Sequence, residues 1–136
     1  MDIDEVIIAN EYLAYRIMKA KEHLERNNMN LEEYQRLAVS TAIYPEEHKV
    51  LYPALGLANE SGECLGKIKK VLRDDNGVYS EEKKNEIGKE IGDTLWYIAA
   101  LARDLDLSLN DIAKQNIEKL QSRKERGVLQ GSGDNR

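Results

Sequence analysis

Four acidic residues stand in two pairs whose spacing suits metal binding. Glu60 and Glu63 form one pair, Glu90 and Asp93 the other, and two residues separate the members of each pair. Side chains three apart lie on the same side of an α-helix, where two like charges are mildly unfavourable. Carboxylate oxygens suit hard cations, Mg²⁺ or Mn²⁺, which are commonly shared with substrate phosphates. Four acids predict either two or more ions, or one ion and a general base.

A solvated helix face would explain any single pair of acids in a chain with 25 Asp and Glu residues. The surroundings of the two pairs favour a functional role, because the two segments match at an offset of 30 residues. The matching positions are Leu57 and Ile87, Glu60 and Glu90, Gly62 and Gly92, Glu63 and Asp93, Leu65 and Leu95, and Ile68 and Ile98.

Each segment also shows an apolar stripe at the helical period of about 100° per residue. The stripes are Leu57, Ser61, Leu65, Ile68 and Leu72 in the first segment, and Ile87, Ile91, Leu95, Ile98 and Ala102 in the second. The acids follow one edge of each stripe, so pairing the helices through their stripes would bring the acids together. Gly62 and Gly92 predict a close approach of the two backbones. Glycine inside a helix is less stable than alanine, so two glycines at matching positions suggest that packing requires them.

The remaining pattern predicts an all-α fold. We expect helices over residues 3–26, 30–42, 53–73, 81–105 and 108–126, with Ser80 and Ser108 as N-terminal caps. The 136 residues fit a single domain, 1–136, with an N-terminal helical extension over 1–29 and a flexible, glycine-rich tail over 127–136. Few helices per chain favour a bundle that is completed by oligomerisation, as a homodimer or homotetramer.

Composition and charge limit the cellular location and the classes of binding partner that we expect. The net charge of −5 argues against binding to nucleic acid or to an anionic membrane. Cys64 is the single cysteine, so the chain has no internal disulfide, and the longest apolar run, 94–102, is too short to span a bilayer. The acidic N-terminus is unlike a signal peptide. The cytoplasm is the expected location.

The runs Gly56–Glu63 and Glu90–Tyr97 resemble the MazG-like nucleotide pyrophosphohydrolases, members of the all-α NTP pyrophosphatase superfamily. Their signature is Glu-x-x-Glu, a spacer, and Glu-x-x-Asp; here the spacer has 26 residues. The resemblance covers about residues 31–126 and leaves the first helix unmatched. It implies that Glu60, Glu63, Glu90 and Asp93 bind Mg²⁺. It also implies cleavage of a (d)NTP into monophosphate and pyrophosphate, as in the removal of non-standard nucleotides.

Several further residues are candidates for contacts with the substrate. Lys67 and Tyr97 extend the acid edges of their helices, and the resemblance adds Gln35 as a nucleotide contact. The fifth predicted helix presents Asn116, Lys119, Arg123 and Arg126 near one face, which fits either a triphosphate clamp or a solvated helix end. Trp96 points to the other side of its helix, where a subunit interface is favoured over base stacking.

Two alternatives remain open. The same fold could act on one specialised substrate, dUTP or phosphoribosyl-ATP. In a different class, the chain could be a non-catalytic helical interaction protein with a vestigial metal site, although the complete set of acids argues against this. The sequence leaves open which acid is the general base; Glu63 is our choice.

Overall fold

A computed structural model of the chain describes residues 10–19, 21–22 and 29–133, and all regular structure among them is helical. The all-α prediction is confirmed. The chain divides into two compact units, Met1–Asn30 and Leu31–Arg136. In the first unit, residues 10–19 and 21–22 are helical. The rest of the predicted helix over residues 3–26 lies outside the described ranges.

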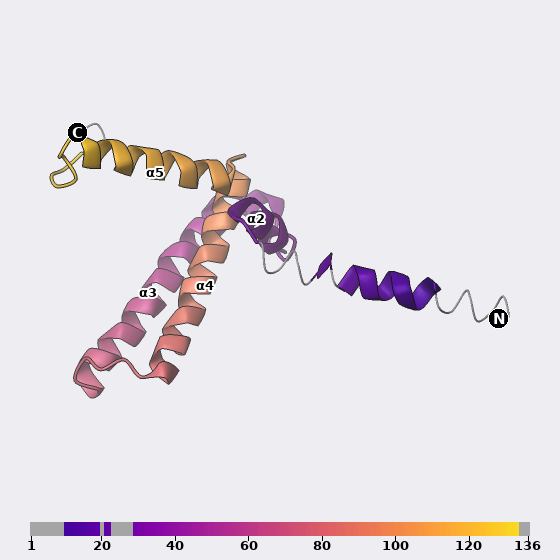
Figure 1. The fold of residues 1–136 in the computed structure, drawn as a ribbon. Coiled ribbons are helices and arrows are strands. Elements are labelled where there is room, and N and C mark those ends of the chain that lie inside the picture. The colour runs from indigo at the N-terminus through magenta and orange to yellow at the C-terminus, as the bar shows by residue number, and fades with distance from the viewer. Residues whose placement is uncertain (1–9, 20, 23–28, 134–136) are drawn as a thin grey trace. The chain divides into compact units, whose positions relative to one another are not determined.

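The second unit carries the candidate site on a pair of long helices. Its elements are α2 (Leu31–Val39), a 3₁₀ turn (Glu46–His48), α3 (Leu51–Asp74), α4 (Glu81–Asp104) and α5 (Leu109–Glu125). α3 and α4 run antiparallel and form the α3–α4 hairpin, α2 packs against α4, and α5 begins where it meets both α2 and α4 (Figure 1). None of the helices in the described part of the chain is long and apolar enough to cross a membrane.

Local sequence explains where these helices begin and end. The Ser80 side chain accepts a hydrogen bond from the backbone N–H of Lys83 at 3.2 Å, and Ser108 does the same for Asp111 at 3.2 Å. Both predicted caps are therefore confirmed. The turn between α3 and α4 uses left-handed backbone at Asn76 and Gly77, which the glycine adopts without strain. α3 begins two residues before Pro53, which leaves the proline in its first turn.

The predicted apolar stripes of the hairpin are only partly buried within the described part of the chain. Leu65 is 66% exposed and Ile91 57% exposed. The two helices interact along the acid edges of these stripes, where Lys67 forms an ion pair with Glu90 and the ring of Tyr97 covers Gly56. The buried residues of the two helices are small or medium in size: Pro53, Val71, Ala99, Ala100 and Ala102. Glu60 and Glu90 are partly buried where the two helices meet, while large apolar side chains such as Leu65, Leu72 and Ile91 stay exposed.

The predicted role of Gly62 and Gly92 in a close approach of the two backbones differs from what the structure shows. A Cβ atom added to Gly62 or Gly92 would meet no described residue within 4 Å, so packing among the described residues requires neither glycine. A Cβ at Gly56 would lie 2.1 Å from Cε1 of Tyr97. Gly56 is therefore the glycine that a close approach requires, and what it admits is an aromatic ring rather than a helix backbone.

Candidate functional site

Three of the four predicted acids meet between α3 and α4. One carboxylate oxygen from each of Glu60, Glu90 and Asp93 lies within 4.8 Å of the other two, and we call these residues the acid cluster. Glu60 comes from α3, while Glu90 and Asp93 are one turn apart on α4. The side chain of Glu90 is only 13% exposed. An all-oxygen set of this kind suits a hard divalent cation that keeps some coordination positions for other ligands.

Lys67 extends the acid cluster toward the turn of the hairpin. Its Nζ lies 3.2 Å from Oε1 of Glu90, so it forms an ion pair across the two helices. A cation at this place offsets part of the repulsion among three neighbouring carboxylates. The Lys67 ammonium group also places a positive charge beside the acids, where it can attract an anionic group.

Glu63 is the predicted acid that lies apart from the cluster. Its side chain is exposed, and Oε1 accepts a hydrogen bond from Nδ2 of Asn59 at 3.0 Å. It borders a separate depression on α3 that also includes Lys67 and Lys70. Its predicted role as a metal ligand or general base therefore stays a prediction.

A depression of about 410 Å³ opens beside the acid cluster, and we call it the central depression. It is lined by Glu60, Asp93, Trp96 and Tyr97. Burial raises the pKa of the Tyr97 hydroxyl, and Tyr52, Glu60 and Asp93 act in the same direction. The phenol therefore stays protonated at neutral pH and can donate a hydrogen bond.

Sequence reasoning missed a second tyrosine near the acids. Tyr34 lies on α2, is partly buried, and its hydroxyl has a raised pKa because of burial and then the charge of Asp93. The helical spacing of α2 gave no sign of this, because the effect depends on how α2 packs against α4. α2 thus contributes to the surroundings of the acid cluster.

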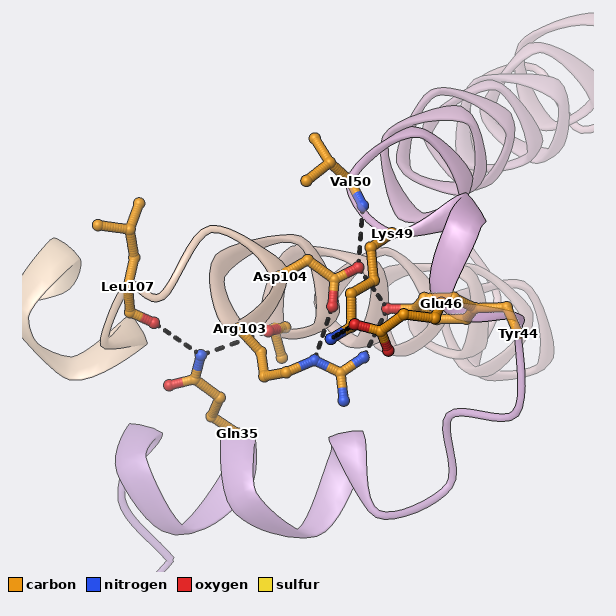
Figure 2. A network of polar contacts seen from close by, with 9 residues as sticks. Gln35, Tyr44, Glu46, Lys49, Val50, Arg103, Asp104 and Leu107 are labelled. Carbon is orange, nitrogen blue, oxygen red and sulfur yellow. Dashed lines mark hydrogen bonds and ion pairs between the residues drawn. The ribbon is translucent and has the colours of Figure 1, made fainter.

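A buried carboxylate secures the end of the hairpin that lies beyond the central depression (Figure 2). The Asp104 side chain is 0% exposed. It accepts hydrogen bonds from the Tyr44 hydroxyl at 2.8 Å, the Val50 N–H at 3.0 Å and Nε of Arg103 at 2.7 Å. Burial alone would raise the pKa of Asp104, but these hydrogen bonds outweigh it and hold the pKa below its ordinary value. We call these four residues the Asp104 network.

The Asp104 network holds a strained backbone at the start of α3. Val50 has φ 66° and ψ −55°, a conformation that a β-branched residue rarely adopts. The Leu51 N–H donates to the carbonyl of Lys49 at 2.7 Å, which closes a γ-turn around Val50. Such strain persists only where the surroundings enforce it, and the bond from Val50 to Asp104 does so. It fixes the first turn of the helix that carries Glu60.

Gln35 has a structural role that the sequence did not indicate (Figure 2). Its Nε2 donates to the carbonyls of Leu107 at 3.0 Å and Ala99 at 3.4 Å, and its Oε1 accepts from the Leu109 N–H at 3.0 Å. The amide therefore joins α2 to the connection between α4 and α5. A direct contact between Gln35 and a nucleotide stays a prediction.

Three of the predicted substrate contacts, Asn116, Lys119 and Arg123, lie on α5, and the fourth, Arg126, caps its C-terminus. Asn116 and Lys119 border a depression formed by α5 residues. Arg123 is 5% exposed, and its Nη2 donates to the Gly133 carbonyl at 3.3 Å, while Nε of Arg126 donates to Ser122 Oγ at 3.3 Å. Their role in binding phosphate stays a prediction, and so does the mobility of the tail, whose residues 134–136 lie outside the described ranges.

Comparisons with known proteins agree with this geometry. The family described as the MazG nucleotide pyrophosphohydrolase domain matches residues 48–128, which include α3, α4, α5 and all three members of the acid cluster. The Gene 37 protein of Mycobacterium phage L5 is 46% identical over 114 residues, covering 79% of this chain and 100% of the phage protein. No solved structure matches the chain significantly.

Proposed function

Because the chain belongs to the MazG nucleotide pyrophosphohydrolase family, we propose that it hydrolyses a nucleoside triphosphate to the monophosphate and pyrophosphate, with magnesium as its cofactor. The observation that carries the proposal is the acid cluster, three carboxylates within 4.8 Å of one another, beside a depression large enough for part of a small molecule. A vestigial site in a non-catalytic interaction protein has no need to keep this arrangement.

The donor chemistry of the acid cluster fits the proposed cofactor. Its ligands are carboxylate oxygens, which Mg²⁺ prefers, and Mn²⁺ is the expected substitute. When bound, the ion would polarise a water molecule and offset the negative charge of the phosphates. Glu60, Glu90 and Asp93 would hold it. Lys67, already paired with Glu90, would remain near enough to attract a phosphate oxygen.

The other residues near the cluster have proposed roles in orienting the reaction. Glu63, one turn beyond Glu60 on α3, would leave Asn59 to act as a further ligand or as the base that takes a proton from the attacking water. Tyr97 would donate its phenolic proton to a sugar or phosphate oxygen. Attack at the α-phosphorus then releases pyrophosphate, and the protein contributes mainly position and charge.

Glu63→Gln tests the role of Glu63 directly. We expect the variant to lose most hydrolysis and to gain less thermal stability from magnesium than the wild type, because a ligand stabilises the form that binds it. Differential scanning fluorimetry with and without magnesium measures the second effect. Unchanged turnover together with unchanged magnesium stabilisation would remove Glu63 from the site.

Assembly is the second part of the proposal. We expect a homodimer or homotetramer, because the described part of the hairpin leaves large apolar side chains exposed, among them Leu55, Leu65, Leu72 and Ile91. An exposed apolar surface of this kind favours association. α5 leads away from the hairpin in Figure 1, so its basic end would serve the acids most easily through a second chain. A monomer by light scattering at micromolar concentration would contradict this proposal.

A panel of nucleotides tests the activity. The purified chain is incubated with ribo- and deoxynucleoside triphosphates, modified nucleotides, dUTP and phosphoribosyl-ATP, and the products are separated. We expect pyrophosphate and a monophosphate from at least one substrate, and no turnover with a chelator present. Orthophosphate as the first product would contradict the proposed bond cleavage. Release from dUTP or phosphoribosyl-ATP alone would favour the specialised alternative, and no release from any nucleotide would favour an interaction protein.

A further inference from the structure

Trp96 lies where the sequence did not place it. It borders the central depression together with Glu60, Asp93 and Tyr97, so it shares one space with two members of the acid cluster. The residue is one helical turn beyond Asp93 on α4. It is half-buried, which leaves part of the indole accessible.

The position of the indole ring is fixed by its neighbours. Nε1 donates to the Ala38 carbonyl at 3.0 Å and to Thr41 Oγ1 at 2.9 Å, which ties the ring edge to the end of α2. The ring packs edge to face with Tyr97 at a centroid distance of 5.0 Å and with Tyr44 at 6.5 Å. A ring held on several sides loses little conformational entropy when it binds a flat ligand.

The surroundings of the acid cluster differ at its two ends. Toward the turn of the hairpin, Lys67 pairs with Glu90. Toward α2, Asp93 is followed by Trp96 and Tyr97. A nucleotide has the same polarity, with charged phosphates at one end and a flat, neutral base at the other. The cationic end of the site suits the phosphates, and the aromatic end suits the base.

We infer that Trp96 is a specificity-determining residue that contacts the nucleobase of the substrate, whose phosphates point along the hairpin toward Lys67. The inference rests on the proposed function. It goes further by giving the bound nucleotide a direction and by giving the base a named partner. It is an alternative to the expectation that Trp96 belongs to a subunit interface.

The chain contains one tryptophan and seven tyrosines, so fluorescence excited at a wavelength where tyrosine does not absorb reports on Trp96 alone. The probes are the α,β-methylene analogues of dATP, dCTP, dGTP and dTTP with magnesium, since they cannot be cleaved between the α- and β-phosphates. Inorganic tripolyphosphate with magnesium is the matched probe without sugar or base, and N-acetyltryptophanamide corrects for absorption by the bases. We expect at least one analogue to quench Trp96 with saturation, and tripolyphosphate to leave the emission unchanged.

Two variants separate the base contact from the structural role of the ring. Trp96→Leu removes the aromatic surface, so we expect KM for the best nucleotide to rise about tenfold with kcat little changed. The inhibition constant of tripolyphosphate should stay the same. Trp96→Phe keeps an aromatic face but loses the hydrogen bonds to α2, and should recover most of the affinity. Tyr79→Leu, in the turn of the hairpin, is the control for loss of an exposed aromatic residue and should have no effect.

The possible outcomes distinguish the base contact, a subunit interface at Trp96 and a failure of the proposed function. Equal quenching by tripolyphosphate and by a nucleotide analogue would overturn the base contact, and so would hydrolysis or analogue binding without any change in Trp96 emission. A change in emission on dilution alone, with none on adding an analogue, would return Trp96 to a subunit interface. If calorimetry detects no binding of any nucleotide, the proposed function fails together with this inference.

Discussion

α3 and α4 end in the same dipeptide, Arg73-Asp74 in one helix and Arg103-Asp104 in the other, and the two ends have different roles. In each, Nε of the arginine donates to Oδ1 of the neighbouring aspartate at 2.7 Å. Asp74 is 50% exposed in the turn of the hairpin, whereas Asp104 is 0% exposed and also binds Tyr44 and Val50. The same local interaction is a surface ion pair at one end and the centre of a buried network at the other.

The acid cluster gives a third setting for carboxylates. Asp104 accepts hydrogen bonds from three residues, which uses most of its capacity to accept them. Glu60, Glu90 and Asp93 instead face one another, and Lys67 forms an ion pair with one of them. A carboxylate that stabilises the fold is saturated with donors. One that binds a metal or substrate keeps acceptor capacity for it, and this difference can be tested by substitution.

The largest effect should come from Asp93→Asn. We expect hydrolysis to fall about a hundredfold or more, because even partners of metal ligands typically contribute 10- to 100-fold. Without metal the variant should melt no lower than the wild type, since one of three neighbouring negative charges is removed. Initial rates of pyrophosphate release and thermal melting in chelator measure the two effects. A large loss of metal-free stability with normal turnover would make Asp93 a structural residue.

Asp104→Asn should show the opposite pattern, with its main effect on stability. The amide cannot accept all three hydrogen bonds, so we expect a loss of about 1–3 kcal/mol in the free energy of unfolding by urea. Asp74→Asn is the matched control, with the same neighbouring arginine in an exposed setting, and should change stability by about 0–1 kcal/mol. Equal losses in the two variants would show that the buried network adds nothing to the shared ion pair.

Acid should weaken the contribution of Asp104. Its pKa in the folded chain is below the ordinary value of about 3.9, so its stabilisation is complete above that pH and is lost as pH falls through the folded pKa. The difference in unfolding free energy between wild type and Asp104→Asn should therefore be constant from about pH 7 to pH 5 and shrink below about pH 4. Urea titrations at several pH values measure it. A difference that is independent of pH down to pH 3 would contradict the assigned hydrogen bonds.

The smallest effect concerns two glycines of the hairpin. Gly92→Ala should stabilise a single chain by about 0.5–1 kcal/mol, because an added Cβ meets no described residue within 4 Å and alanine favours helix. Gly56→Ala should destabilise the fold, because its Cβ would overlap the ring of Tyr97. If Gly92→Ala instead weakened assembly by light scattering, this glycine would face a second chain.

The sequence was most informative where the chemistry and structure are local. Serine caps at Ser80 and Ser108, and the four acids in their two pairs, follow from spacing along the chain, and the family match supports the resemblance. The periodicity of apolar residues did not correctly predict the faces through which α3 and α4 contact each other. The apolar stripes include Leu65 and Ile91, which are exposed, whereas the interactions between the helices join Lys67 to Glu90 and place the Tyr97 ring over Gly56. An apolar stripe alone does not show whether its partner lies in the same chain.

Contacts between distant segments could not be predicted from patterns. Tyr34 beside Asp93, and Trp96 against the end of α2, depend on how α2 packs on α4. The positive φ of Val50 gives no signal in the sequence, because valine is among the residues least suited to it. The resemblance gave Gln35 as a nucleotide contact, but it gave no sign that the Gln35 amide would hydrogen-bond backbone groups between α2 and the start of α5.

The bond between Asp104 and Val50 also bears on the order in which the molecule folds. Helix contacts within the hairpin close a short loop, whereas this bond joins residues 54 positions apart. Closing a longer loop costs more chain entropy, so we expect the hairpin to form early and the γ-turn at Val50 to close late. Disrupting the bond should then speed unfolding while leaving the refolding rate nearly unchanged. The strained turn would act as a latch, controlling how long the folded chain persists.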